Sequence, residues 1–332
     1  MNRSKVDKYL DKSVLEVVGF GNTEPGDYQP KPVVLRDGRE GMVWVHRETG
    51  HGILDPELWE SKNYYVEEYR NEYSPIPGEK CAPSDRLNIL NDLNEKQFNF
   101  FESYLSRECR YLEIGCSCGG ILRKVLDFGV DICHAVEPNK QDADFVKKHY
   151  KQATVYNTSL EDTNLTPDYY ELIVSIEVLE HAKSVRDFLL KCYVLLKDSG
   201  VIHLEVPNHN DALLTLYKYT GYDKFYYHKA HIHYFTKESL EKLCSECGIE
   251  GEASSFVMYP FFNHVWWCQN QRAQSSAVEA LSTPLPTDGK TEAGKAINEF
   301  YKRSEMKYEE LLNKHTLGTS LMFQGKKQAG CK

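Results

Sequence analysis

The sequence contains no long apolar run. None of its apolar stretches approaches the roughly 18 residues that a membrane-spanning helix needs, and the opening stretch, MNRSKVDKYLDKS, lacks the apolar centre of a secretory signal. These absences predict a soluble, cytoplasmic protein with no membrane partner. The ten cysteines stand at irregular spacings, so we expect reduced thiols and no disulfide framework.

An excess of positive charge is also missing. The 332 residues carry a formal net charge of −9, and 41% of them are hydrophobic, which is enough to bury one full-sized core. The negative balance disfavours a protein that holds nucleic acid through a broad basic surface. Because no stretch interleaves aromatic and basic residues in the manner of a nucleic-acid platform, a tRNA or rRNA partner is not expected.

The order of apolar and amphipathic segments predicts three parts. Residues 1–75 are rich in Gly, Pro, Tyr and charge and contain short strand-like pieces, which predicts a small β-rich appendage followed by a helix. Residues 76–270 alternate strand and helix patterns, which is typical of a doubly wound α/β domain with a mostly parallel seven-stranded sheet. In this domain FFNHVWW is expected to continue the last strand and to place both tryptophans in the core. Residues 271–332 are predicted to form a linker, a C-terminal helical extension and a frayed end, LGTSLMFQGKKQAGCK.

A glycine-broken loop follows the first strand of the predicted domain, in YLEIGCSCGG. Gly115 permits a sharp turn, Gly119 or Gly120 permits a close approach of the backbone to a ligand, and the next helix directs its positive end to the same place. The G-x-x-x-G spacing departs from the dinucleotide pattern, so a pyrophosphate is disfavoured. Glu137 ends the second strand, where its carboxylate can accept two hydrogen bonds from a ribose diol. Taken alone, the loop also fits an ordinary strand-to-helix turn.

These blocks, followed by YELIVSIEVLEH and LLKDSGVIHLEVPN in the expected order, resemble the class I S-adenosylmethionine-dependent methyltransferases. The resemblance implies a Rossmann-like fold, S-adenosylmethionine as cofactor and S-adenosylhomocysteine as product. It places Glu113 and Gly115 near the methionine part and Glu137 on the ribose. The full set of cofactor-binding residues that it implies is Glu113, Gly115, Cys116, Gly119, Glu137, Ser159, Leu160, Ile176 and Glu177.

The N-terminal region resembles that of sugar methyltransferases of polysaccharide biosynthesis, which begin with a zinc ribbon of two C-x-x-C-G knuckles. The block GHGILDPELWESKNYYVEEYRNEY matches, but the knuckle positions read VVGFG and HRETG, without cysteine. Structural zinc needs four Cys or His ligands, and His46 and His51 are all that remain. We therefore expect a degenerate ribbon held by a small apolar core and no bound metal.

Two histidines are candidates for a general base. Methyl transfer needs an acceptor docked in line with the methyl group, and a hydroxyl acceptor needs a group that takes its proton. His181 ends the EVLEH block, and His231 matches a histidine of the sugar C-methyltransferases, whose neighbouring glutamate is Ala230 here. The loss of that carboxylate favours O-methylation over C-methylation. A structural role for either histidine, and a metal role for His231 together with His233, are the alternatives.

Other polar and aromatic residues are weaker candidates for the acceptor site. His209, His228 and His233 lie in or near the same histidine-rich block, and Tyr69 and Tyr73 lie on a helix that covers the cofactor mouth in related enzymes. The predicted acceptor is a small molecule, most simply a sugar or a sugar-containing intermediate of glycan or natural-product biosynthesis. A polyketide or quinone acceptor, C- or N-methylation, and a noncatalytic cofactor-binding scaffold are alternatives. The amphipathic C-terminal helix packs either on its own core or on a second subunit of a homo-oligomer.

Overall fold

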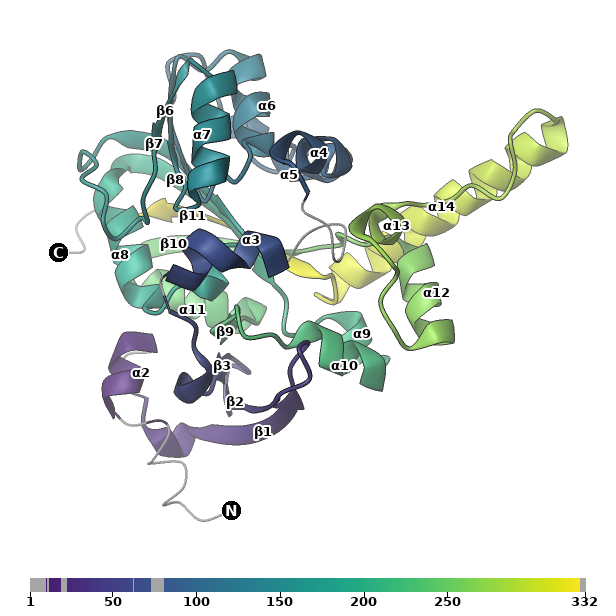
Figure 1. Ribbon diagram of the computed structural model, residues 1–332, viewed down its shortest axis with the longest axis horizontal. Helices are drawn as coiled ribbons and strands as arrows, with labels where there is room; N and C mark the ends of the chain where they lie inside the picture. The colour runs from purple at the N-terminus through teal and green to yellow at the C-terminus, as the bar shows by residue number, and fades with distance from the viewer. Residues whose placement is uncertain (1–9, 11, 19–22, 62, 73–80, 329–332) are drawn as a thin grey trace.

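A seven-stranded sheet forms the centre of the molecule (Figure 1). The computed structural model describes residues 10, 12–18, 23–61, 63–72 and 81–328. The strand order is β10-β11-β8-β7-β4-β5-β6, with parallel pairing from β8 to β6 and antiparallel pairing of β11 with both of its neighbours. The predicted doubly wound fold is thus confirmed. The strands are β4 (Arg110–Ile114), β5 (Ile132–Val136), β6 (Ala153–Tyr156), β7 (Tyr170–Ile176), β8 (Leu196–Pro207), β10 (Ile249–Phe256) and β11 (Ser320–Lys327).

Helices cover both faces of this sheet because its strands are apolar on both sides. In β7, Leu172 and Val174 pack in one cluster with residues of α5, α6 and α7, while Ile173 packs in another with residues of α8 and α11. Side-chain caps fix the starts of α7, α8 and α11, through Asn139, Ser184 and Thr236 respectively. The helices around the sheet are α4 (Pro83–Ile89), α5 (Asn91–Phe98), α6 (Gly120–Phe128), α7 (Lys140–His149), α8 (Val185–Leu195) and α11 (Lys237–Glu246).

The N-terminal region forms a separate small sheet of order β1-β2-β3-β9, with α2 beside it. Its core contains Leu15, Tyr28, Trp44 and Ile53. Residues 19–21 of the first knuckle position lie outside the described residues. At the second knuckle position, HRETG, the His46 Nδ1 atom lies 3.0 Å from Thr49 Oγ1. The resemblance to a zinc ribbon stays a prediction. The elements are α2 (Lys12–Val18), η1 (Pro25–Asp27), β1 (Tyr28–Val34), β2 (Glu40–His46), β3 (Gly52–Leu54), η2 (Pro56–Leu58) and β9 (His233–Tyr234).

The C-terminal segment was predicted wrongly in two places. Residues 320–327 are the buried strand β11, which pairs with β8 and β10, and do not fray. FFNHVWW belongs to the helix α12 (Phe261–Asn270), which begins after Pro260; Trp267 is buried there, but Trp266 is not. The helix predicted near the C-terminus is α14 (Glu292–Lys314), which extends away from the body with α13 (Ala277–Leu281) near it (Figure 1).

Two strands cross the borders of the three predicted parts. β9 comes from the middle part but completes the N-terminal sheet, and β11 comes from the last part but lies inside the main sheet. The division of the chain into parts at residues 75 and 270 therefore stays a prediction from the sequence. No helix among the described residues has the length and apolarity needed to cross a membrane. The remaining short elements are η3 (Tyr64–Glu68), α3 (Tyr69–Glu72), η4 (Glu102–Tyr104), η5 (Leu179–His181), α9 (Ala212–Thr215) and α10 (Thr220–Tyr226).

Candidate active site

A cavity of about 650 Å³ opens at the carboxyl ends of β4, β5 and β7. This volume lies within the range of about 300–1,000 Å³ that small-molecule and cofactor sites occupy. Ten of the residues singled out from the sequence line it: Tyr69, Glu113, Gly115, Cys116, Glu137, Ser159, Leu160, Ile176, Glu177 and His181. The strands of a doubly wound sheet bring these residues together because their carboxyl ends meet at one edge.

The glycine loop keeps the backbone close to this cavity. Gly115 has a φ of +76°, and a Cβ atom built on it would lie 2.4 Å from Val178 Cγ2. Gly119 has a φ of +81°, and its Cβ would lie 2.8 Å from the Tyr150 ring. Gly119 caps α6 and does not itself line the cavity. Ser117, which sequence reasoning did not select, lines the cavity with a φ of +49°.

Glu137 is held in place by backbone donors. Its Oε2 atom accepts a 2.7 Å hydrogen bond from Ser117 N, and its Oε1 atom accepts a 2.8 Å bond from Asn139 N. Each carboxylate oxygen can accept more than one hydrogen bond, so capacity is left for a diol in the cavity. Burial raises the pKa of Glu137, and the nearby positive charge of Arg70 opposes this rise. The arrangement suits a ribose.

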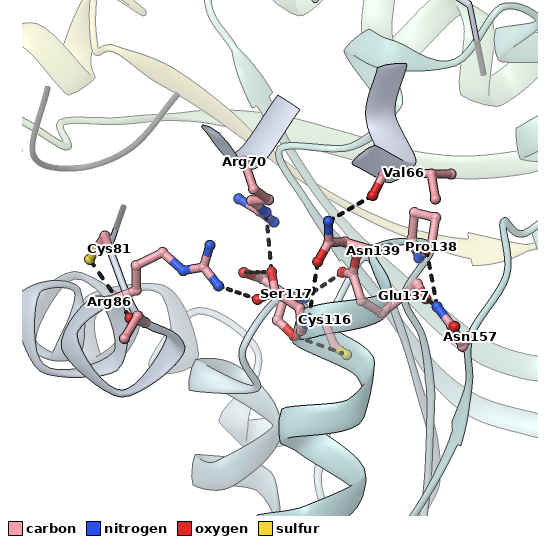
Figure 2. Close-up of polar contacts among 12 residues, drawn as sticks. Val66, Arg70, Cys81, Arg86, Cys116, Ser117, Glu137, Pro138, Asn139 and Asn157 are labelled. Carbon is pink, nitrogen blue, oxygen red and sulfur yellow. Dashed lines mark hydrogen bonds and ion pairs between the residues drawn. The ribbon is translucent and has the colours of Figure 1, made fainter. Parts of the chain in front are cut away.

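The segment η3–α3 covers the cavity as a lid, which we define as residues 64–72. Tyr65, Val66, Tyr69 and Arg70 of this lid line the cavity, and Figure 2 shows Arg70 above Ser117 of the glycine loop and Val66 beside Asn139. The Val66 carbonyl accepts a 2.8 Å hydrogen bond from Asn139 Nδ2. The other lid candidate, Tyr73, lies outside the described residues.

A buried carboxylate of α7 ties the lid to α4. Asp142 has 1% of its surface exposed, and its Oδ2 atom lies 3.2 Å from Arg70 Nε in the lid. Its Oδ1 atom pairs with Arg86 of α4, which is also buried. Figure 2 shows Arg70 and Arg86 approaching this carboxylate, next to Ser117, from different elements. No local pattern in the sequence signals this contact, since the three partners lie far apart along the chain.

Buried carboxyl groups surround the inner end of the cavity, below the loop after β7. Glu177 lines the cavity with a φ of +54°, a strained conformation for a residue other than glycine. Burial raises its pKa to about 7, and burial raises the pKa of Glu113 to about 8. Glu205 lies behind Glu177 and accepts a 2.8 Å hydrogen bond from Gln97 Nε2. The lining and the residues behind it therefore hold several carboxyl groups.

His181 reaches the cavity from η5 with a defined orientation. Its Nδ1 atom lies 2.6 Å from the carbonyl oxygen of Ala230, so this nitrogen carries the proton and the Nε2 atom is the acceptor. Burial lowers the pKa of His181 to about 4, which keeps the ring neutral at pH 7. The rings of Tyr65 and Tyr69 in the lid pack on it edge to face, at centroid distances of 5.3 and 5.2 Å.

The other histidine candidates do not line this cavity. The His231 ring lies 4.9 Å from the His181 ring, and His228 packs against His231 at 3.6 Å. His209 contacts the Gly50 carbonyl at 3.0 Å. His233 belongs to strand β9 of the N-terminal sheet, and its Nδ1 atom lies 3.1 Å from His51 Nε2. His231 and His233 thus have different neighbours and do not form the metal pair that was considered as an alternative.

The sequence predicted that His231 has no carboxylate partner. In the structure, Glu180 of another element lies next to it. Glu180 Oε1 lies 3.7 Å from Nε2 of His231 and 3.7 Å from Nε2 of His181. Ligand atoms of these three residues lie within 4.8 Å of one another, and no other such group occurs in the described part of the chain. The absence of a metal stays a prediction. Sequence reasoning missed Glu180 although it precedes His181 directly.

Comparison with known proteins assigns the family. Residues 83–253 match the family model described as a methyltransferase domain, so the chain belongs to this family. This membership confirms the predicted cofactor, S-adenosylmethionine, with the fold seen in the sheet. The carbohydrate-biosynthesis resemblance receives no support from it.

Relatives with assigned names share about half of their length with this chain. The ubiquinone biosynthesis O-methyltransferase of Haemophilus ducreyi is 24% identical over 137 residues, which are 38% of this chain and 58% of that protein. Its counterpart in Nitrobacter winogradskyi is 27% identical over 150 residues, 40% of this chain and 55% of that protein. The chain thus spans less than two thirds of either relative.

Solved structures with a similar fold come from S-adenosylmethionine-dependent methyltransferases. That of Archaeoglobus fulgidus covers 71% of this chain and 94% of its own, with a TM-score of 0.46 and 18% identity. The likeness to the enzyme of Mesorhizobium loti covers 69% of this chain and 96% of that chain, with a TM-score of 0.44 and 12% identity. The strand order of this chain establishes its fold independently of these likenesses.

Proposed function

We propose that the chain transfers a methyl group from S-adenosylmethionine to a hydroxyl oxygen of a small molecule. The observation that carries the proposal is His181, which lines the cavity and whose Nε2 atom is left as an acceptor because Nδ1 is bound to the Ala230 carbonyl. A neutral imidazole in this place suits removal of the hydroxyl proton.

In this proposal each part of the cavity has one task. Glu137 binds the ribose hydroxyls, Ser159 and Leu160 flank the adenine, and the glycine loop lies along the methionine part. The lid excludes water from the reacting groups, which favours transfer to the acceptor over hydrolysis. When bound, S-adenosylmethionine supplies an electrophilic methyl group on a sulfonium sulfur.

Two classes of acceptor follow from different observations. A sugar or sugar-containing intermediate is proposed from the sequence resemblance of the N-terminal block and the histidine-rich block. A phenolic hydroxyl is the second candidate, because the relatives in Haemophilus ducreyi and Nitrobacter winogradskyi are named ubiquinone biosynthesis O-methyltransferases. His209, His228 and His233 are proposed to border the acceptor only at a distance, since they do not line the cavity. We also propose that α14 packs against a second subunit in a homo-oligomer.

The test has two stages. Isothermal titration with S-adenosylhomocysteine, with NAD as control, is expected to give micromolar binding of the first ligand alone. Transfer of a labelled methyl group is then measured with nucleotide-linked sugars and with catechols, in wild type and in the His181→Ala variant. Binding without transfer to any acceptor would favour a noncatalytic cofactor-binding protein, and full turnover by the variant would remove His181 as the base.

A further inference from the structure

The cavity reaches past the residues expected to hold the ribose, toward the ends of β7 and β8. Glu137 follows β5, which lies on one side of β4 in the sheet, whereas Glu177 follows β7 on the other side. Glu177 N donates a 2.9 Å hydrogen bond to the carbonyl oxygen of Glu205 in β8. Because Glu137 and Glu177 both line the cavity, a ribose at Glu137 leaves the part above β7 for another group.

Helix α5 contributes one side of this second part. Leu93 and Gln97 lie one turn apart on the same face of the helix, and both line the cavity. Gln97 is buried, and its Oε1 atom accepts a 3.1 Å hydrogen bond from Asn94 Nδ2. Its Nε2 atom donates a 2.8 Å hydrogen bond to Glu205 Oε2. Since an amide nitrogen carries two hydrogens, Gln97 can donate the second one to a ligand.

Met258 contributes another side from the segment that follows β10. It is half-buried and lines the cavity, and its backbone N–H donates a 3.2 Å hydrogen bond to Thr319 Oγ1. The next residue, Ser320, donates a 3.3 Å hydrogen bond to Glu177 Oε1, which brings this segment to the end of β7. We define the β7–β8 pocket as the part of the cavity lined by Leu93, Gln97, Glu177 and Met258.

The β7–β8 pocket combines apolar surface with two polar groups. Leu93 offers no hydrogen bond and the Met258 sulfur is a weak acceptor, so the polar groups are the Gln97 amide and the Glu177 carboxyl group. A sugar carries hydroxyl groups around its whole ring, and a hydroxyl buried against Leu93 or Met258 without a partner costs free energy. A phenolic ring keeps its oxygen atoms on its edge, and a methionine sulfur packs well against aromatic rings.

We propose that the β7–β8 pocket binds the ring of a hydroxylated aromatic acceptor. Leu93 and Met258 contact the apolar body of the ring, and Gln97 donates a hydrogen bond to an oxygen next to the one that is methylated. This inference rests on the proposed function, because it concerns the acceptor whose hydroxyl faces His181. It selects the phenolic class over the sugar class, and Leu93, Gln97 and Met258 determine specificity without taking part in proton transfer.

The first test measures binding without turnover. Catechol, 4-methylcatechol and 4-propylcatechol are titrated into the protein saturated with S-adenosylhomocysteine, and UDP-glucose is the sugar probe. Each methylene group buried in the pocket is expected to raise the affinity by up to about four-fold, and UDP-glucose is expected to bind more weakly than catechol. An affinity that does not rise along the catechol series, or tighter binding of UDP-glucose than of catechol, would overturn the inference.

Variants of the two apolar residues locate this binding. Leu93→Asn and Met258→Gln are each expected to remove most of the gain along the catechol series. Leu190→Asn and Met306→Gln are the matched controls, because these two side chains are exposed and do not line the cavity. The two pocket residues come from different elements, so one variant still gives an answer if the other does not fold. A gain that persists in every folded pocket variant would place the ring elsewhere and overturn the inference.

Gln97→Met tests the proposed hydrogen bond to the acceptor. Wild type is expected to bind catechol about five-fold more tightly than phenol, and the variant is expected to bind the two equally. This ratio separates recognition from a structural role, because a loss of stability alone would weaken both ligands alike. An unchanged ratio would remove Gln97 from the acceptor site. Binding of catechol in the pocket without methyl transfer would support this inference and count against the proposed O-methylation, so the two can fail separately.

Discussion

Replacing Gly115 by alanine tests whether the glycine loop must stay free of side chains. The residue has a φ of +76°, and an added Cβ would lie 2.4 Å from Val178 Cγ2. The left-handed backbone costs a residue with a side chain about 1–2 kcal/mol, and the overlap adds about 1–3 kcal/mol. Gly115→Ala is therefore expected to lower the free energy of unfolding by about 2–5 kcal/mol and to weaken binding of S-adenosylhomocysteine.

Gly129 offers a matched control in the same part of the fold. Its φ is +102°, but an added Cβ would have no atom within 4 Å, so Gly129→Ala should cost only the backbone term of about 1–2 kcal/mol. Thermal and urea unfolding give the difference, and calorimetric titration gives the affinity. Adding Val178→Ala to Gly115→Ala should restore part of both losses. Equal destabilisation by the two glycine variants, with unchanged affinity, would refute the close contact.

Three further changes test other parts of the site. Glu137→Gln should weaken binding of S-adenosylhomocysteine about 100-fold, because hydrogen bonds to a charged group contribute about 1.5–3 kcal/mol each. Titration calorimetry measures this affinity, and a loss below three-fold would show that Glu137 does not bind the ribose. Asp142→Asn should cost about 3–5 kcal/mol of unfolding free energy, because Arg86 would stay buried without its charge partner; unchanged stability in urea would contradict the pair. His203 is fully buried with both ring nitrogens unpartnered among the described residues, and burial lowers its pKa to about 3. Below pH 6.5 this ring therefore binds a proton in the unfolded state and not in the folded state. Between pH 7 and pH 5 the free energy of unfolding of wild type should fall by about 2 kcal/mol more than that of His203→Phe. Parallel pH dependence of the two proteins in urea unfolding would show that the ring titrates normally.

Local patterns were sufficient to predict the parallel half of the sheet and the cofactor end of the site. Gly115 and Glu137 stand directly at strand ends, so their position along the chain already fixes their position in a doubly wound fold. β11 was missed because its pairing with β8 and β10 joins residues far apart along the chain, and nothing local signals such a partner. FFNHVWW was predicted as a strand because a short apolar run fits a buried strand and a buried helix equally well.

The acceptor end depended on contacts that no spacing reveals. The sequence predicted that His231 lacks a carboxylate neighbour, because Ala230 stands next to it where related enzymes carry a glutamate. The structure places Glu180 beside it through a separate segment, joined by the hydrogen bond from Ile232 N to the Glu180 carbonyl oxygen. The link between the Arg70 side chain and Asp142 was missed for the same reason, since it joins the lid to α7.

The position of β11 determines when the main sheet can be completed during synthesis. Residues 320–327 leave the ribosome after every other strand of that sheet, yet they lie between β8 and β10. Until they arrive, the hydrogen-bonding edge of β8 has no neighbour on that side, and an open edge strand pairs readily with other chains. The nascent chain thus cannot close this edge of the main sheet before its last strand has been made.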